Sequence, residues 1–134
     1  MVEIWSMSKP ITIVAMMILY EEEKYDLNDK VSKYIPSFSN LKCKSNDEIY
    51  KCNNDLKIIH FLTHTSGFKY YDDGLGNISH AETSFLSLQD WIDTLILNQH
   101  LEFEPGTDYQ YGINQAILGR LIEELSEQSF YQFL

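Results

Sequence analysis

Basic residues are scarce in this chain of 134 residues, which carries 10 lysines and arginines against 20 aspartates and glutamates, for a formal net charge of −10. Proteins that bind the phosphate backbone of nucleic acids need clustered lysine and arginine. The composition therefore argues against nucleic-acid binding. It says little about a small-molecule substrate, because net charge bears on solubility and association more than on chemistry.

Long apolar runs are also lacking. The longest covers residues 11–20, and a transmembrane helix needs about 20 apolar residues. Three glutamates at 21–23 follow this run, where a signal peptide would have small residues at a cleavage site. We therefore interpret the run as a buried helix and expect no membrane span, and the compartment stays open.

The chain has only two cysteines, Cys43 and Cys52, nine positions apart in a polar segment. They have no histidine partners nearby in sequence, so they do not suggest zinc. They could form a disulfide in an oxidising compartment or remain free thiols, and the sequence leaves both open.

Two histidines, His60 and His64, are four positions apart, a spacing that can place two metal ligands on one helix face. No glutamate follows His60 and no third ligand is evident, so structural histidines are the favoured interpretation. We expect His64 to hydrogen-bond the segment that carries Ser66 and Gly67. No metal and no cofactor is predicted.

Hydrophobic residues make up 44% of the chain, enough for a core in one domain or part of a larger one. Apolar spacing and capping signals predict a mainly α structure with almost no strand. The predicted helices cover residues 8–23, 30–34, 56–63, about 87–96 and 113–126, with a further helix capped by Ser129. Residues 37–55 and 69–83 are predicted to be loops, Gly67 to stop a helix, and 105–106 to form a turn.

Near the start of the first predicted helix, Ser6 and Lys9 form an S-x-x-K pattern. Residues three apart on a helix share a face, so the Lys9 amine would lie beside the Ser6 hydroxyl. A serine hydroxyl becomes a useful nucleophile when a nearby base takes its proton. The pattern alone is weak, because a serine that caps a helix is an ordinary structural feature.

Two later stretches strengthen the functional interpretation of the S-x-x-K pattern. They are residues 61–68, Phe-Leu-Thr-His-Thr-Ser-Gly-Phe, and residues 105–113, Pro-Gly-Thr-Asp-Tyr-Gln-Tyr-Gly-Ile. With these motifs the chain resembles the serine β-lactamase and penicillin-binding superfamily, especially the class C-like branch with esterase-like members. The resemblance covers almost the whole chain. It implies an α+β fold of helices and an antiparallel sheet, of which residues 1–134 would be an incomplete, mainly α portion, truncated at both ends.

The resemblance also implies roles for three residues. Ser6 matches the nucleophile that forms an acyl-enzyme, Lys9 the lysine that helps to deprotonate it, and Tyr111 the tyrosine that relays the proton. A tyrosine beside a lysine ammonium has a stabilised phenolate and can act as a base closer to neutral pH. The expected partner is a small ester or amide, and the oligomeric state stays open.

Three departures from the family pattern refine this prediction. Ile113 stands where lactamases have an asparagine two places after the tyrosine, which favours carboxylic esters over β-lactams. Glu127 replaces a common helix-ending glycine. The family's K-T-G or H-T-G triplet is absent, so we expect the isolated chain to lack activity. The alternatives are an inactive or non-catalytic ligand-binding member, or a true β-lactamase or D-peptidase.

Overall fold

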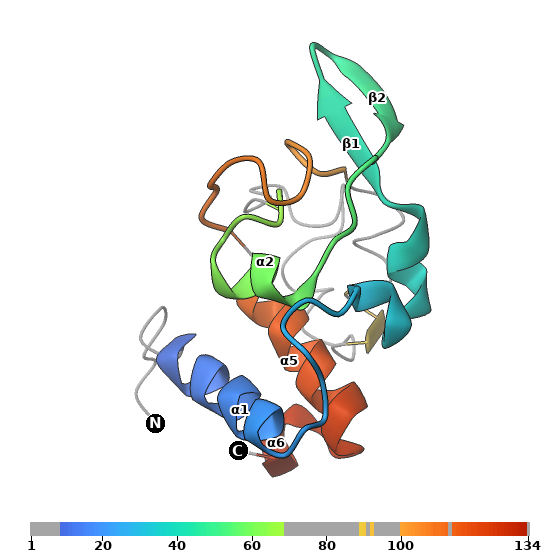
Figure 1. Cartoon of the computed structure of the whole chain (residues 1–134). Coiled ribbons are helices and arrows are strands. Elements are labelled where there is room, and N and C mark those ends of the chain that lie inside the picture. The colour runs from blue at the N-terminus through green and yellow to red at the C-terminus, as the bar shows by residue number, and fades with distance from the viewer. Residues whose placement is uncertain (1–8, 69–88, 91, 93–99, 113, 134) are drawn as a thin grey trace, which may run out of the picture.

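A computed structural model describes residues 9–68, 89–90, 92, 100–112 and 114–133 of the chain (Figure 1). Its described elements are four α-helices, two short 3-10 helices and one two-stranded antiparallel sheet. In chain order they are α1 (Lys9–Glu21), η2 (Val31–Lys33), η3 (Pro36–Asn40), β1 (Lys42–Ser45), β2 (Glu48–Lys51), α2 (Ile58–Leu62), α5 (Asn114–Ser126) and α6 (Phe130–Phe133).

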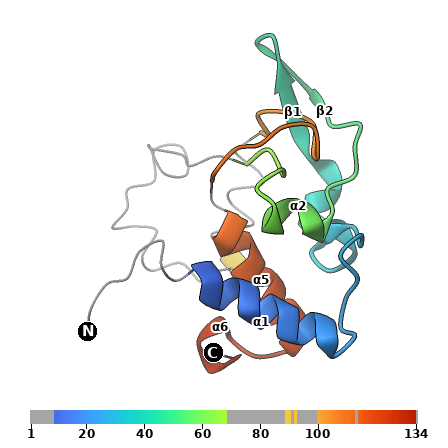
Figure 2. The same cartoon turned by 60° about the vertical axis from the view of Figure 1, so that its left-hand side comes forward.

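Helix α5 lies at the centre of the helical part and packs against α1, α2 and α6 (Figures 1 and 2). Its apolar residues recur at helical spacing, so they form one buried face. The most buried side chains of α1 and α5, the two longest described helices, include Met16 and Leu19 from α1 and Ile117, Leu118, Leu121 and Ile122 from α5. The structure thus confirms both predicted helices, 8–23 and 113–126, in the described residues, except that the first ends at Glu21 and residues 22–23 form a turn.

A second part of the core joins the middle of the chain to these helices. The rings of Phe38, Phe61 and Phe68 lie 6.1–6.3 Å apart, centroid to centroid, and all three are buried. They come from η3, from α2 and from the residue after Gly67, so the three rings join these three segments. Their packing fixes the segment 64–68 on top of α2, and this segment adjoins the candidate site.

The prediction that residues 37–55 form a loop was wrong. The segment contains η3 and an antiparallel hairpin in which Lys42 pairs with Lys51 and Ser45 with Glu48. A disulfide joins Cys43 and Cys52, with Cα atoms 5.1 Å apart. The strands carry little apolar alternation, and the fully buried Cys43 anchors them to the rest of the molecule. The hairpin projects from the helical part (Figure 1).

The helix ends agree with several predictions and correct one. Glu127 has φ +58°, the left-handed conformation that ends many helices, and Ser129 exchanges hydrogen bonds with Gln132 at the start of α6. The residue with positive φ directly after α2 is His64, at +56°, and not Gly67. Gly67 (φ +96°) instead serves a close approach described below.

Some predictions fall on residues outside the described ranges, among them the loop 69–83 and Ile113. Of the predicted helix near 87–96, residues 89, 90 and 92 are described and are helical. Within the described ranges, no helix has both the length and the apolar character required to cross a membrane.

Candidate active site

The structure describes the three predicted catalytic residues to different extents. Ser6 lies outside the described residues. Lys9 is the first residue of α1, and only its backbone is described. Tyr111 is described in full and lies in the segment between the Pro105–Gly106 turn and α5. The geometry around Tyr111 is therefore the part of the predicted site that can be built from contacts.

The Tyr111 ring is 39% exposed and stacks on the imidazole of His64, with the centroids 4.9 Å apart and the planes inclined by 30°. Tyr109, which is 62% exposed, meets the same imidazole edge-on at 5.9 Å. The imidazole thus contacts both phenol rings. A flat contact of this kind limits the tilt of the Tyr111 ring while the side chain remains open to solvent.

A buried hydrogen-bond chain fixes His64 in turn. The Asn114 amide nitrogen lies 2.8 Å from Nδ1 of His64, and its amide oxygen accepts the Ser66 hydroxyl at 2.5 Å. Because the amide oxygen is taken by Ser66, the amide nitrogen donates to the imidazole. Ser66 and Asn114 are fully buried. His64 was expected to hydrogen-bond the segment that carries Ser66 and Gly67; the imidazole bonds instead to Asn114, which links it indirectly to Ser66.

Asn114 was missed in the sequence. It is the first residue of α5, a helix whose buried side chains are mostly apolar, with Arg120 as the other buried polar residue. A polar residue at such a position needs a partner inside the protein, because burying an amide without one costs free energy. That rule could have marked Asn114 as part of a network, but it could not have named its partners.

The segment that carries Tyr111 is tied to the segment after α2 by backbone hydrogen bonds. Peptide N–H groups of Glu102, Gly106 and Gln110 donate to the carbonyl oxygens of Gly67, Thr65 and His64, at 2.9, 2.8 and 2.9 Å. The two segments run side by side in both views of the molecule (Figures 1 and 2). The third of these bonds lies next to Tyr111, so its backbone is fixed relative to His64.

Two glycines make this close approach possible. Gly106 has φ +85°, and a Cβ atom there would lie 3.1 Å from Nε2 of His60. Gly67 has φ +96°, and a Cβ atom there would lie 2.8 Å from the Phe103 carbonyl oxygen. Residues with side chains rarely adopt these φ values, and the neighbouring atoms leave little room for one. Each motif therefore requires its glycine for packing as well as for conformation.

His60 supports the turn and lies within α2, whereas His64 lies beyond the end of that helix. Its Nδ1 accepts the Lys57 N–H at 3.0 Å, which caps α2. Burial, and then the nearby Lys57 ammonium, lower the pKa of His60 below its ordinary value of 6.5. The neutral imidazole is therefore the favoured form beside Gly106, as expected of a structural histidine.

Within the described residues, one cluster brings three potential metal-binding side chains together: Cys43, Cys52 and Glu104. Its sulfur atoms are bonded to each other, which settles the alternative that the sequence had left open. Metals bind the thiolate form of cysteine, and a disulfide has no thiolate. The cluster in its oxidised form is thus not a two-cysteine metal site.

Several curated proteins are similar to this chain. A protein named "Putative D-alanyl-D-alanine carboxypeptidase" from Salmonella heidelberg is 35% identical over 116 residues, which cover 86% of this chain and 26% of that protein. A protein of the same name from Salmonella paratyphi B is 34% identical over the same share of both chains. This chain thus spans about a quarter of the length of the curated relatives that it matches.

Solved structures share the fold. The structure of EstCE1, a hydrolase with promiscuous acyltransferase activity, superposes with a TM-score of 0.73 at 25% identity, over 96% of this chain and 34% of that one. Simvastatin synthase (LovD) from Aspergillus terreus superposes with a TM-score of 0.68 at 22% identity, over 95% of this chain and 33% of that one. These matches confirm a partial serine β-lactamase-like fold, mostly helical with a small antiparallel sheet. The family model described as Beta-lactamase matches residues 1–134, and the chain therefore belongs to the beta-lactamase family.

Proposed function

We propose that this chain carries the nucleophile and proton-transfer groups of a serine hydrolase or acyltransferase. The family membership supports a hydrolase of this class. The single observation that carries the proposal for Tyr111 is its setting: a solvent-accessible phenol stacked on a hydrogen-bonded imidazole, in a segment fixed by backbone hydrogen bonds. A group that transfers protons must be accessible and held in position, and Tyr111 is both.

The proposed reaction proceeds through an acyl-enzyme. Ser6 Oγ bonds to the substrate's carbonyl carbon as its proton passes to Lys9 or Tyr111. The tetrahedral intermediate collapses and expels the alcohol or amine, which takes up a proton. Water or another acceptor then attacks the acyl-enzyme and releases the product. The Ser6 backbone N–H would be one of the donors that stabilise the negative oxygen.

Carboxylic esters are the proposed substrate class, with related amides as a second possibility. Ile113 supports this choice, since it offers no amide where lactamases have an asparagine that grips the β-lactam side chain. The similarity to EstCE1, a hydrolase with promiscuous acyltransferase activity, also supports it. The competing candidate is a D-peptidase, which the names of the Salmonella relatives favour.

We also propose that residues 1–134 form the helical portion of a larger catalytic domain. The chain covers 26% of its first curated relatives and 34% of EstCE1. A pocket that holds and turns over substrate would then need residues beyond this portion. On this proposal the 134 residues contain an activated serine but do not turn over substrate efficiently by themselves.

A fluorophosphonate probe tests the nucleophile, because it needs an activated serine and little of the substrate pocket. Mass spectrometry of the labelled chain should place the adduct on Ser6, and Ser6→Ala should remove it. Absence of labelling in a well-folded sample would support a non-catalytic, ligand-binding member of the family. Turnover of p-nitrophenyl acetate by the 134 residues, abolished by Ser6→Ala, would contradict the proposal that they are incomplete.

Nitrocefin, short-chain nitrophenyl esters and a D-alanyl-D-alanine peptide, each offered to the longer protein that contains these residues, separate the substrate classes. Faster hydrolysis of the esters is the expected result. Preference for the peptide would favour the D-peptidase candidate, and preference for nitrocefin would favour a true β-lactamase.

A further inference from the structure

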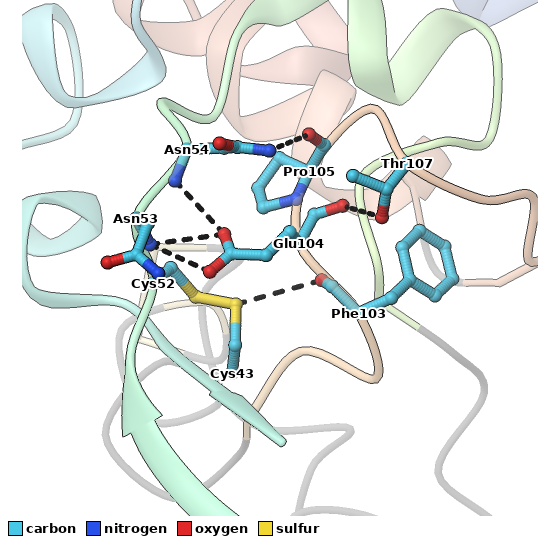
Figure 3. Close-up of a disulfide and its surroundings, with 8 residues drawn as sticks. All are labelled: Cys43, Cys52, Asn53, Asn54, Phe103, Glu104, Pro105 and Thr107. Carbon is cyan, nitrogen blue, oxygen red and sulfur yellow. Dashed lines mark hydrogen bonds between the residues drawn. A yellow bond between two sulfur atoms is a disulfide. The ribbon is translucent and has the colours of Figure 1, made fainter. Parts of the chain in front are cut away.

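Glu104 stands between the segment that carries Tyr111 and the disulfide-closed hairpin (Figure 3). One carboxylate oxygen accepts the Asn53 N–H at 2.8 Å, and the other accepts the N–H groups of Asn53 and Asn54 at 3.1 and 3.0 Å. The Tyr50 hydroxyl also acts on this carboxylate and helps to lower its pKa. Hydrogen bonds to a charged acceptor are about twice as strong as those between neutral groups.

The groups that donate to Glu104 directly follow a covalently closed loop, residues 43–52. Asn53 follows Cys52 directly, and Cys52 is bonded to Cys43 across the hairpin. Cys43 also forms a parallel β-bridge, through backbone pairing, with Leu101, three residues before Glu104. The Sγ atom of Cys43 lies 3.7 Å from the Phe103 carbonyl oxygen. The disulfide thus lies directly before the Asn53–Asn54 segment that faces Glu104 (Figure 3).

Through its backbone, Glu104 forms the first residue of the turn that leads to Tyr111. Its carbonyl oxygen accepts both the backbone N–H of Thr107, at 3.1 Å, and the Thr107 hydroxyl, at 2.6 Å. The Asn54 side chain donates to the Pro105 carbonyl at 3.2 Å and adds a second link to the hairpin. The Gly106 N–H of this turn donates a hydrogen bond to the Thr65 carbonyl in the segment after α2. An unbroken set of contacts therefore runs from the disulfide to the tyrosine.

The charge of Glu104 fits this role. Partial burial raises the pKa of its carboxyl, but the hydrogen bonds from Asn53, Asn54 and Tyr50 outweigh burial and lower the pKa below its ordinary value of 4.5. The group is thus a carboxylate at neutral pH and accepts every hydrogen bond described above. Both of its oxygens accept hydrogen bonds from Asn53 and Asn54, the residues that follow the hairpin and Cys52, so the side chain holds that segment.

We propose that Glu104 is a positioning residue for Tyr111, which it links to the Cys43–Cys52 hairpin so that reduction of the disulfide loosens the tyrosine segment. Its relevance to catalysis rests on the role proposed above for Tyr111. Reduction by a dithiol transfers two electrons and two protons, which break the S–S bond, give two cysteine thiols and leave the reductant as a disulfide. After reduction no covalent bond joins Cys43 to Cys52. The Asn53–Asn54 segment, which follows Cys52, is then freer to move away from Glu104.

Hydrogen exchange of the full chain measures this link without any need for activity. The reporters are the amides of Gly106 and Gln110, because each donates across to the segment after α2. In oxidised Glu104→Ala these amides should exchange about tenfold faster than in wild type, the effect of losing charge-assisted hydrogen bonds. Glu104→Gln should lie between the two, since its amide keeps one acceptor oxygen.

Glu48→Gln is the matched control, because it removes a charge from the exposed side of the same hairpin. It should leave both reporter amides unchanged. Amides within α5 should also keep their wild-type rates in every variant. If α5 exchange rises as much as loop exchange in Glu104→Ala, the residue serves general stability and the proposal is wrong.

Hydrogen exchange after reduction of the disulfide is the second test. A dithiol should speed exchange at Gly106 and Gln110 in wild type and add little in Glu104→Ala, because the link through which it acts is already gone. An equal effect of reduction in both proteins would overturn the coupling. Unchanged reporters in Glu104→Ala and Glu104→Gln would overturn the positioning role itself.

Fluorophosphonate labelling of Ser6 separates this inference from the proposed function. Glu104→Ala should label about tenfold more slowly than Glu48→Gln, with partial rescue in Glu104→Gln. If wild type is not labelled and the exchange pattern is as expected, the proposed function fails and the link to the hairpin stands. If Glu104→Ala labels as fast as Glu48→Gln, the catalytic part of the positioning role is contradicted.

Discussion

The helical region and the tyrosine segment are held in different ways. Helices α1 and α5 meet through buried aliphatic side chains such as Met16 and Leu121. Residues 101–111 have few buried side chains and are held by directional bonds: backbone N–H groups to the segment after α2, and the Glu104 carboxylate to the hairpin. Apolar packing depends on volume, whereas directional bonds depend on each donor and acceptor.

This difference suits the two regions to different tasks. A packed core tolerates shifts of side chains as long as its volume is filled, so it provides stability. A segment tied by hydrogen bonds at fixed atoms sets the position of one side chain, in this case the Tyr111 phenol. The predictions below change one region at a time and ask whether the other responds.

The largest effect on stability is expected in the helical region. Leu121→Ala removes a fully buried side chain from the centre of α5 and should lower the free energy of unfolding by about 2–5 kcal/mol. Denaturant unfolding measures this change. Ile18→Ala on α1 is the control, since Ile18 is 44% exposed and its truncation should have an effect several times smaller. Equal losses in both variants would contradict the buried position of Leu121.

A smaller loss is expected where the two regions meet. Asn114→Ala leaves the buried Ser66 hydroxyl and His64 Nδ1 without their partner, which should cost about 1–3 kcal/mol in the free energy of unfolding. Asn114→Asp keeps an acceptor for Ser66 but loses the donor to His64, so it should lie between Asn114→Ala and wild type. An Asn114→Ala protein as stable as wild type would show that the buried hydrogen-bond chain does not hold the segment.

The smallest effect is a pH dependence located at His60. Burial lowers its pKa in the folded protein below 6.5, so the unfolded chain takes up the proton first as the pH falls. Stability should therefore decline as the pH drops from above 6.5 through the lowered pKa of the folded state. The decline should be weaker in His60→Gln, compared by denaturant unfolding at a series of pH values. Stability that rises on acidification over this range, in wild type alone, would contradict the assignment.

How much could be predicted from the sequence differs between the same two regions. The apolar spacing around Met16 and Leu121 predicts buried helices, because helix packing selects residues at that period. Ser129 marks the start of a helix through local hydrogen bonds with Gln132. These features depend on neighbours in the chain, and the structure confirms them.

The tyrosine segment depends on partners far away in the sequence. Glu104 meets Asn53 across 51 positions, and Asn114 meets His64 across 50. No spacing rule connects such residues. The hairpin was missed because Lys42, Lys44 and Glu48 lack the apolar alternation of an ordinary strand, and two cysteines alone do not reveal that they pair. The positive φ of His64 was missed because the following glycine was the more usual candidate.

The central claim is that Tyr111 transfers protons for Ser6, and the rate of fluorophosphonate labelling at Ser6 tests it most directly. Tyr111→Phe keeps the ring on His64 and removes only the hydroxyl, so labelling should slow by about 100-fold, the lower range for loss of a general base. Tyr109→Phe is the matched control, because Tyr109 contacts the same imidazole edge-on, and it should label at the wild-type rate. Labelling of Tyr111→Phe as fast as wild type would contradict the account.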